Sequence, residues 1–359
     1  MAERLSGKPT AAPRMVVFGA TGHLGRELID RLAESRWPVA ELVCVASPES
    51  AGIDVAFRGE SLDVWVEPPR LQGYDLVFVC TPEAVGLEVV RKALRAEVPC
   101  IDCSGSLVGR DEVPMPLRAA ELEGQASGIA AAPLLALASG TTIAWTPILE
   151  ALAAAAGLRR VVGTVLSSAS ARGRRGVVAL SEESIALFNQ SEPPESGPAG
   201  QPVAFDVIPD GGIDEPRVAR ELERLFGSAF GVALSHVEVP TFVGEGAALA
   251  IELEAPLAPD EIESLLGKLE GLTSVPTGPG SRGLVAVGAE DGPTTGGGST
   301  PSGPTLRDSA GRSEVLVGRP RPDPSLEPGC GWLLWLSLDP LGLAADHALR
   351  LAARRLGLS

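Results

Sequence analysis

A glycine-spaced loop near the N-terminus constrains the fold of this chain more than any other feature. Residues 15–18 are apolar and read as a buried parallel strand, and glycines follow at positions 19, 22 and 25. Apolar residues then recur at helical spacing through residues 24–33. A strand, a glycine turn and a helix form a cradle for phosphate, because glycine permits a sharp turn and the helix N-terminus presents free N–H groups. The sequence therefore predicts an α/β fold of the dinucleotide-binding type, the alternative being a glycine-rich turn that binds nothing.

The residues expected to hold a cofactor come from this loop and from the ends of the strands that follow it. Residues 41–46 read as a second strand, whose end recognises the adenosine ribose in a dinucleotide fold. Glu49 follows that strand, where a carboxylate favours the free 2′-hydroxyl of NAD and repels the 2′-phosphate of NADP, unless it simply faces solvent. We expect NAD or NADP, with NAD favoured. The candidate cofactor-binding residues are Gly19, Ala20, Thr21, Gly22, His23, Leu24, Gly25, Ser47, Ser50, Thr81 and Pro82.

Length, charge and cysteine usage exclude several classes of protein. A chain of 359 residues is long enough for two domains, and a net charge of −16 argues against nucleic acid or an anionic membrane as a partner. The five cysteines are unevenly spaced, which favours a reducing cytoplasm over a disulfide framework. Residues 1–13 lack the apolar core of a signal peptide and read as a disordered leader. Residues 129–158 are apolar but too interrupted to span a membrane.

The chain alternates strands and helices as far as residue 102. Strands are expected at residues 75–80 and 98–102, with a helix at residues 84–96 between them, so the sequence predicts a doubly wound parallel sheet. Cys100-Ile101-Asp102-Cys103 spells C-x-x-C, but we interpret it as strand sequence because a redox pair of this spacing begins a helix. No second cysteine pair accompanies it, so no metal site is predicted.

The character of the sequence changes after Pro133. A basic cluster at residues 172–176 precedes an expected helix at 177–188; it can bind a phosphate or carboxylate, or be a solvated helix start. Residues 234–239 and 247–254 alternate like strands of an antiparallel sheet with one wet face. Residues 277–303 are of low complexity and read as a mobile insertion. Helices are also expected at residues 142–156, 216–226, 260–269 and 341–356, and strands at residues 160–169, 315–319 and 332–338.

A set of short motifs resembles the aspartate-semialdehyde dehydrogenase family from Arg14 to the C-terminus. The motifs are Gly19–Gly25, Ser50–Gly52, Ile101–Ser104, Ala204–Pro209, Val239-Pro240 with Gly244, and Glu314–Arg319. The resemblance implies an N-terminal Rossmann-like dinucleotide-binding domain at residues 14–133, completed by the C-terminal helix 339–359. It also implies an α+β dimerisation domain at residues 134–338, and hence a homodimer. Members of the family reduce an aspartyl phosphate to the semialdehyde with NADPH through a cysteine thioester, in amino-acid biosynthesis.

This sequence departs from the family at each position that carries the chemistry. The nucleophile position, the last residue of the pattern Asn-Pro-Asn-Cys, falls on Leu135. The pattern Arg-Val-Pro, whose Arg holds the substrate carboxylate, is here Glu238-Val239-Pro240, and the base of the pattern Gly-His is Glu245. No catalytic residue is therefore predicted. The family Gln falls near Ser167, the phosphate-binding Arg on Val108 with Arg110 two residues away, and the NADP-selective Arg on Glu49.

Three functions remain open at this point. Within the family the chain is most similar to non-catalytic paralogues of Usg type, on the run at residues 168–175, which suggests a binding or regulatory homologue. The second is an oxidoreductase with altered chemistry, acting on an aldehyde or acyl phosphate; Glu238 and Glu245 can then bind a cation or move protons, or else be solvated. The third is a scaffold that dimerises with an active paralogue. The imidazoles His23, His236 and His347 have no obvious Ser or Cys partner, and Cys103 has no obvious base.

Overall fold

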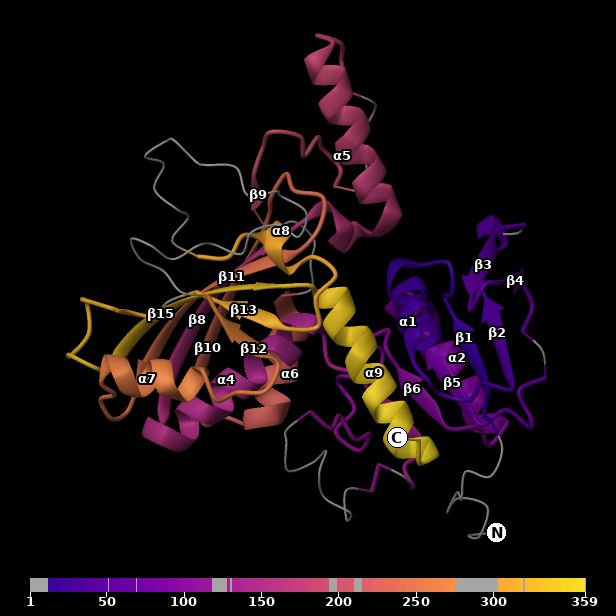
Figure 1. Cartoon of the computed structure of the whole chain (residues 1–359), viewed down its shortest axis with the longest axis horizontal. Coiled ribbons are helices and arrows are strands. Elements are labelled where there is room, and N and C mark those ends of the chain that lie inside the picture. Colours follow the sequence, from indigo (N-terminus) through magenta and orange to yellow (C-terminus); the bar gives the residue numbers. More distant parts are fainter. Residues whose placement is uncertain are drawn as a thin grey trace. The chain divides into compact units, whose positions relative to one another are not determined.

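The chain folds into two compact units. In the computed structural model one unit comprises Met1–Ile143 with Leu341–Ser359, and the other comprises Ala144–Pro340 (Figure 1). The expected leader, but for Ala12 and Pro13, and the expected insertion, but for Gly303, lie outside the described residues. The structure describes residues 12–50, 52–68, 70–117, 128–129, 131–193, 199–209, 215–275, 303–318 and 320–358.

The first unit is built on a seven-stranded sheet of order β3-β4-β2-β1-β5-β6-β7. Its strands pair in parallel except at the β3–β4 hairpin. The strand order reverses at β1, which has β2 on one side and β5 on the other, and such a switch point is where open α/β sheets bind ligands. The strands are β1 (Arg14–Phe18), β2 (Glu41–Val45), β3 (Asp54–Phe57), β4 (Glu60–Trp65), β5 (Leu76–Val79), β6 (Cys100–Asp102) and β7 (Leu134–Ala136). The doubly wound α/β fold predicted from the sequence is confirmed.

The helices of this unit include one from each end of the chain. Helices α1 (His23–Glu34) and α2 (Glu83–Arg95) follow β1 and β5, and α9 (Pro340–Leu356) is the last element. Apolar residues of α1 and α9 belong to one buried core with β1, β5 and β6. Arg31 of α1 also pairs with Asp346 of α9 at 2.6 Å. Burying a leucine-sized side chain contributes about 1.5–3 kcal/mol, so the apolar stripe of α9 holds the C-terminus in the N-terminal unit.

The second unit is built on a mixed eight-stranded sheet of order β12-β13-β15-β11-β8-β10-β9, with β14 paired to β15. Strand β11 runs antiparallel to both β8 and β15, whereas β10 runs parallel to β8. Strand β10 also pairs antiparallel with β9, so the antiparallel arrangement predicted for residues 234–239 and 247–254 holds except where β10 lies beside β8. The strands are β8 (Leu158–Ser167), β9 (Ile208–Pro209), β10 (Gly231–Glu238), β11 (Glu245–Leu253), β12 (Leu272–Ser274), β13 (Val315–Val317), β14 (Arg321–Pro322) and β15 (Gly331–Leu338).

One face of this sheet is covered by helix α4, whereas part of the other face is exposed. On one face Trp145 of α4 lies against β8 so closely that a Cβ at Gly163 would stand 2.3 Å from the indole ring. On the other face small side chains such as Ala233 and Ala248 are exposed. The helical elements assigned wholly or partly to this unit are α4 (Gly140–Ala156), η3 (Ala169–Arg172), α5 (Gly173–Phe188), α6 (Glu215–Phe226), α7 (Pro259–Leu266) and α8 (Leu306–Ser309).

Several short elements were not predicted from the sequence, among them β3, β4 and β7, and helix α5 was predicted to begin too late. Strands β3 and β4 form a hairpin through Arg58 and Gly59, which both have positive φ (51° and 86°), as a two-residue hairpin turn requires. Strand β7 has only three residues, too few to show a period. Helix α5 begins at Gly173, so the basic cluster at residues 172–176 lies in its first turn and not ahead of it.

Candidate functional site

The glycine loop connects β1 to α1 at the switch point of the first sheet. Gly19 has a φ of +80°, and a Cβ there would lie 2.3 Å from the carbonyl oxygen of Cys80. A Cβ at Gly25 would lie 2.2 Å from the carbonyl oxygen of Gly19. Helix α1 therefore approaches the loop so closely that only glycine fits at position 25. Gly22 caps α1 without a side-chain hydrogen bond. The helix therefore presents its N-terminal dipole to the loop, as a phosphate site requires.

The predicted cofactor-binding residues gather around the ends of β1, β2 and β5. The hydroxyls of Thr21 and Ser50 lie 2.9 Å apart and join the glycine loop to the short helix η2 (Pro48–Ser50) after β2. Thr81 and Pro82 follow β5, where Pro82 caps α2 and the Thr81 hydroxyl is buried with no partner within the described part of the chain. The ends of these strands thus form one rim.

Glu49 and Ser47 lie on the same short helix-containing turn. Glu49 is exposed, and the Ser47 hydroxyl donates a hydrogen bond of 3.0 Å to its carboxylate. A solvated carboxylate beside a hydroxyl is compatible with both roles predicted for Glu49, namely a ribose contact and a plain surface charge. The motif Ser50–Gly52 includes residue 51, which lies outside the described residues.

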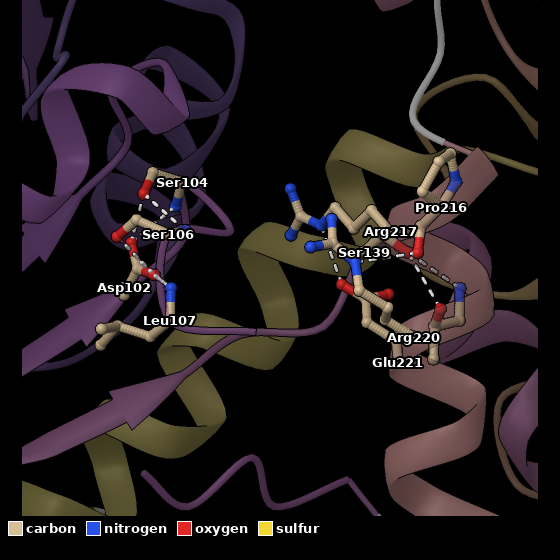
Figure 2. A network of polar contacts seen from close by, with 10 residues as sticks. Asp102, Ser104, Ser106, Leu107, Ser139, Pro216, Arg217, Arg220 and Glu221 are labelled. Atoms are coloured by element: carbon tan, nitrogen blue, oxygen red, sulfur yellow. Dashed lines mark hydrogen bonds and ion pairs between the residues drawn. The ribbon is translucent and has the colours of Figure 1, made fainter. Parts of the chain in front are cut away.

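A buried aspartate organises the loop that follows β6. Asp102 is 1% exposed, and its carboxylate accepts hydrogen bonds from the backbone N–H groups of Ser104 (3.0 Å) and Leu107 (2.9 Å). It also accepts bonds from the hydroxyls of Ser104 and Ser106 (Figure 2). The sequence analysis took Asp102 only as a strand residue. The signal it missed is Asp-x-Ser-x-Ser, because Asp accepts bonds from the backbone two residues on.

The position assigned to the nucleophile lies inside the first unit's core. Leu135 is the central residue of β7, is 1% exposed, and packs with residues of β1 and α1. The helix N-terminus that follows β7 is that of α4, beginning at Gly140, where the hydroxyls of Ser139 and Thr142 lie 3.0 Å apart. No residue from 131 to 158 is a cysteine or a histidine. Neither place can supply a thiolate.

The second unit brings three of the altered positions into a single row. Ser167 at the end of β8 pairs in register with Glu238 of β10 on one side and with Glu245 of β11 on the other. Residues opposite each other in a sheet point to the same face with Cβ atoms about 5 Å apart. Glu238 is 1% exposed and Glu245 is 4% exposed. The sequence analysis considered Glu238 and Glu245 together; the place of Ser167 between them comes from the strand order β10-β8-β11.

One carboxylate of the row is paired with an arginine. Glu238 Oε2 accepts a hydrogen bond from Arg172 Nε at 2.7 Å, and Arg172 ends helix η3 just after β8. Glu238 Oε1 is buried and has no partner within the described residues. A group that donates hydrogen bonds fits this oxygen, and a second carboxylate placed beside it would be repelled.

The three histidines lie in different parts of the fold. His347 of α9 is buried and donates a hydrogen bond of 2.9 Å to the carbonyl oxygen of Pro116 in the same unit. Burial lowers the pKa of His347 to about 4, so its ring is neutral at physiological pH. His23 is the first residue of α1, and His236 lies on β10 two residues before Glu238, on the same face.

A further polar cluster lies on helix α6 of the second unit. Figure 2 shows Arg217 paired with Glu221 one turn later, at 2.8 Å, and Arg220 Nε donating a 3.0 Å bond to the carbonyl oxygen of Pro216. Glu221 is buried, which its place among alternating charges did not indicate. These bonds tie α6 to itself.

The described residues contain no group of three or more His, Cys, Asp or Glu side chains arranged to hold a metal ion. Among the helices of the described residues, none is long and apolar enough to cross a membrane.

Comparison with known proteins matches both units. Residues 14–125 match the family model "Semialdehyde dehydrogenase, NAD binding domain", and residues 149–341 match "Semialdehyde dehydrogenase, dimerisation domain". The chain is 27% identical over 336 residues to the aspartate-semialdehyde dehydrogenase of Vibrio mimicus, covering 90% of this chain and 98% of that one. It is 27% identical over 350 residues to aspartate-semialdehyde dehydrogenase 2 of Vibrio cholerae, covering 94% and 96%.

Solved structures show the same similarity. The crystal structure of aspartate semialdehyde dehydrogenase II complexed with ASA from Vibrio cholerae superposes with a TM-score of 0.80 at 25% identity, covering 96% of this chain and 98% of that one. The Candida albicans enzyme with NADP, at 15% identity, superposes with a TM-score of 0.67 and covers 96% and 98%. The latter similarity concerns the fold alone.

Proposed function

Because this chain belongs to the aspartate-semialdehyde dehydrogenase family, we propose that it is a non-catalytic homologue, which binds a nicotinamide dinucleotide in its first unit and lacks the family's thioester chemistry. The observation that carries the proposal is the absence of a thiol at both places where a nucleophile fits. Leu135 is buried in β7, and the N-terminus of α4 holds Ser139, Gly140 and Thr141. A helix N-terminus is where a cysteine gains reactivity, and the residues at this one carry no thiol.

The row in the second unit supports the same proposal. An arginine that holds a substrate carboxylate acts through paired, charge-assisted hydrogen bonds. Glu238 occupies that position here and carries the opposite charge. Its Oε2 atom is engaged by Arg172. At the base position, Glu245 replaces an imidazole that titrates near neutrality with a carboxylate. An anionic acyl phosphate substrate is therefore disfavoured on both counts.

Cofactor binding is supported by the glycine loop and the strand ends around it in the first unit. The close contacts at Gly19 and Gly25, the uncapped N-terminus of α1 and the Thr21–Ser50 bond all lie at the switch point of the sheet. We assign the site to the eleven predicted residues, with NAD preferred because Glu49 stands near the ribose position.

Assembly through the second unit forms a further part of the proposal. The dimerisation-domain match covers residues 149–341, and the exposed small residues Ala233 and Ala248 give the sheet face an apolar, closely approachable surface. We place the chain on the Usg-type branch because its run at residues 168–175 supplies Arg172, the partner of Glu238. In the scaffold alternative, the same surface forms a heterodimer with an active paralogue.

The test combines an activity assay with a binding titration. Purified protein is supplied with L-aspartate β-semialdehyde, phosphate and NAD or NADP, and no reduction of the dinucleotide is expected. Fluorescence titration with NADH and NADPH is expected to show saturable binding. In Gly22→Asp, the new carboxylate faces the pyrophosphate and weakens binding by at least about tenfold, which corresponds to about 1.4 kcal/mol. Phosphate-dependent turnover, or binding unchanged in Gly22→Asp, contradicts the proposal.

An oxidoreductase with altered chemistry is the second candidate. The observation that favours it is the buried row of Glu238, Ser167 and Glu245, since two carboxylates in one low-dielectric row can move protons. Screening neutral and cationic aldehydes with both dinucleotides distinguishes it, because only this candidate gives turnover that Glu245→Gln abolishes.

A further inference from the structure

Two cysteines of the first unit stand side by side at the ends of β5 and β6. Val79 pairs with Asp102 in the parallel register of these strands, so the next residue of each strand, Cys80 and Cys103, are neighbours. Both side chains pack in the same core cluster, on the face shared with Phe78 and Ile101. The two thiols are also within hydrogen-bonding reach of each other.

The spacing of the two strands suits a covalent link. Adjacent strands lie about 4.8 Å apart, and disulfides form between Cα atoms about 4.4–6.8 Å apart. Cys100 is nearby in sequence, but it alternates with Ile101 and points to the opposite face of the sheet. The neighbour of Cys80 on its own face is therefore Cys103.

The two thiols differ in access. Cys80 is partly exposed, whereas Cys103 is buried. The hydrogen bond to Cys80 and the burial of Cys103 raise the pKa of the Cys103 thiol well above its usual value. An external reagent therefore reaches Cys80 first, and Cys103 serves as the thiol that completes the link.

We propose that Cys80 and Cys103 form a reversible cross-strand disulfide that stiffens the glycine loop, with a low-molecular-weight disulfide as the oxidant. The Cys80 thiolate attacks one sulfur of the small disulfide and releases one small thiol. The Cys103 sulfur then loses its proton and attacks Cys80 Sγ in the mixed disulfide, which releases the second small thiol. The two cysteines lose two electrons and two protons, and the small disulfide gains them. This inference does not depend on whether a dinucleotide binds.

The pair touches the glycine loop through the backbone. The carbonyl oxygen of Cys80 is the atom that a Cβ at Gly19 would meet at 2.3 Å, and the Cys80 N–H donates a hydrogen bond of 2.8 Å to the carbonyl oxygen of Phe18. A link at Cys80 restrains the strand against which the loop packs. Local opening of the loop is then less frequent, and its amides exchange more slowly.

The experiment treats the full-length protein with oxidised glutathione, blocks the remaining thiols by alkylation and digests it with trypsin. Cleavage after arginine places Cys80 in the peptide 71–91, and places Cys100 and Cys103 together in the peptide 96–110. The expected product is these two peptides joined, lost on treatment with dithiothreitol. The link is expected to persist in the matched control Cys100→Ser and to disappear in Cys103→Ser and in Cys80→Ser.

Hydrogen exchange of residues 18–25 is then compared in the oxidised and reduced wild-type protein, and slower exchange is expected after oxidation. Failure to recover the joined peptides from the wild type overturns the proposal, as does a link that survives in Cys103→Ser. Identical exchange in the two states overturns the coupling to the loop.

Discussion

Replacing Asp102 by alanine tests whether this one carboxylate holds the loop after β6. Its four donors are two backbone N–H groups and two hydroxyls. The hydroxyls can rotate to new acceptors, but the amides of Ser104 and Leu107 are fixed by the chain. A buried donor left without an acceptor costs about 1–3 kcal/mol, so Asp102→Ala is expected to lower the free energy of unfolding by about 2–6 kcal/mol. That loss is a large part of the about 5–15 kcal/mol typical of a folded protein.

The assay is urea denaturation followed by circular dichroism, with hydrogen exchange of residues 103–108 as the local measurement. Asp323 provides the matched control, because it accepts bonds from the N–H and the hydroxyl of Ser325 in the same Asp-x-Ser pattern but on an exposed loop. Asp323→Ala is expected to have a much smaller effect, since water replaces the lost acceptor. If both variants unfold at the same urea concentration, or if the 103–108 amides stay protected in Asp102→Ala, the reasoning from buried donors is refuted.

Three further measurements follow from the contacts described. The pKa of His347 is about 4 in the folded protein and about 6.5 in the unfolded chain. The free energy of unfolding is therefore highest above pH 6.5 and falls by about 3 kcal/mol as the pH is lowered toward 4. Urea titrations at several pH values should show a smaller fall in His347→Gln. Arg172→Met leaves Glu238 buried without its cation and should lower the free energy of unfolding by about 3–5 kcal/mol in the same titration. The double variant Arg172→Met with Glu238→Met should recover most of that loss. Equal losses in the single and the double variant contradict the ion pair. Ala248→Glu puts a charge on the exposed sheet face and should convert dimer to monomer by light scattering, whereas an unchanged mass excludes this face as the interface.

The parts of the fold predicted from sequence are those with strong local signals. The glycine loop, α1 and α9 were located because apolar residues recur at helical spacing beside glycines whose role is steric. The hairpin β3–β4 was missed because its turn is Arg58-Gly59, and a non-glycine residue with positive φ gives little sequence signal. The parallel pairing of β10 with β8 was missed for another reason. Alternation reports which face is buried but not the direction of the neighbouring strand.

The candidate site was predicted only in part as an arrangement. Glu238 and Glu245 were considered together, but Ser167 is far from both in sequence, and only the order β10-β8-β11 places it between them. The same limit applies to Cys80 and Cys103, because the sequence pattern drew attention to Cys100 with Cys103. The relevant neighbour lies across a strand pair, and strand pairing is a long-range property that local spacing does not encode.

The place of α9 has a consequence for the order of synthesis. Residues 340–356 are synthesised after every other element of the first unit, yet their leucines and alanines complete a core whose other members were made earlier. During translation the N-terminal sheet must therefore wait with an open apolar groove, and the intervening unit has time to fold before the groove closes. A chain that terminates before this helix leaves the groove uncovered, and chaperones bind such exposed apolar surface.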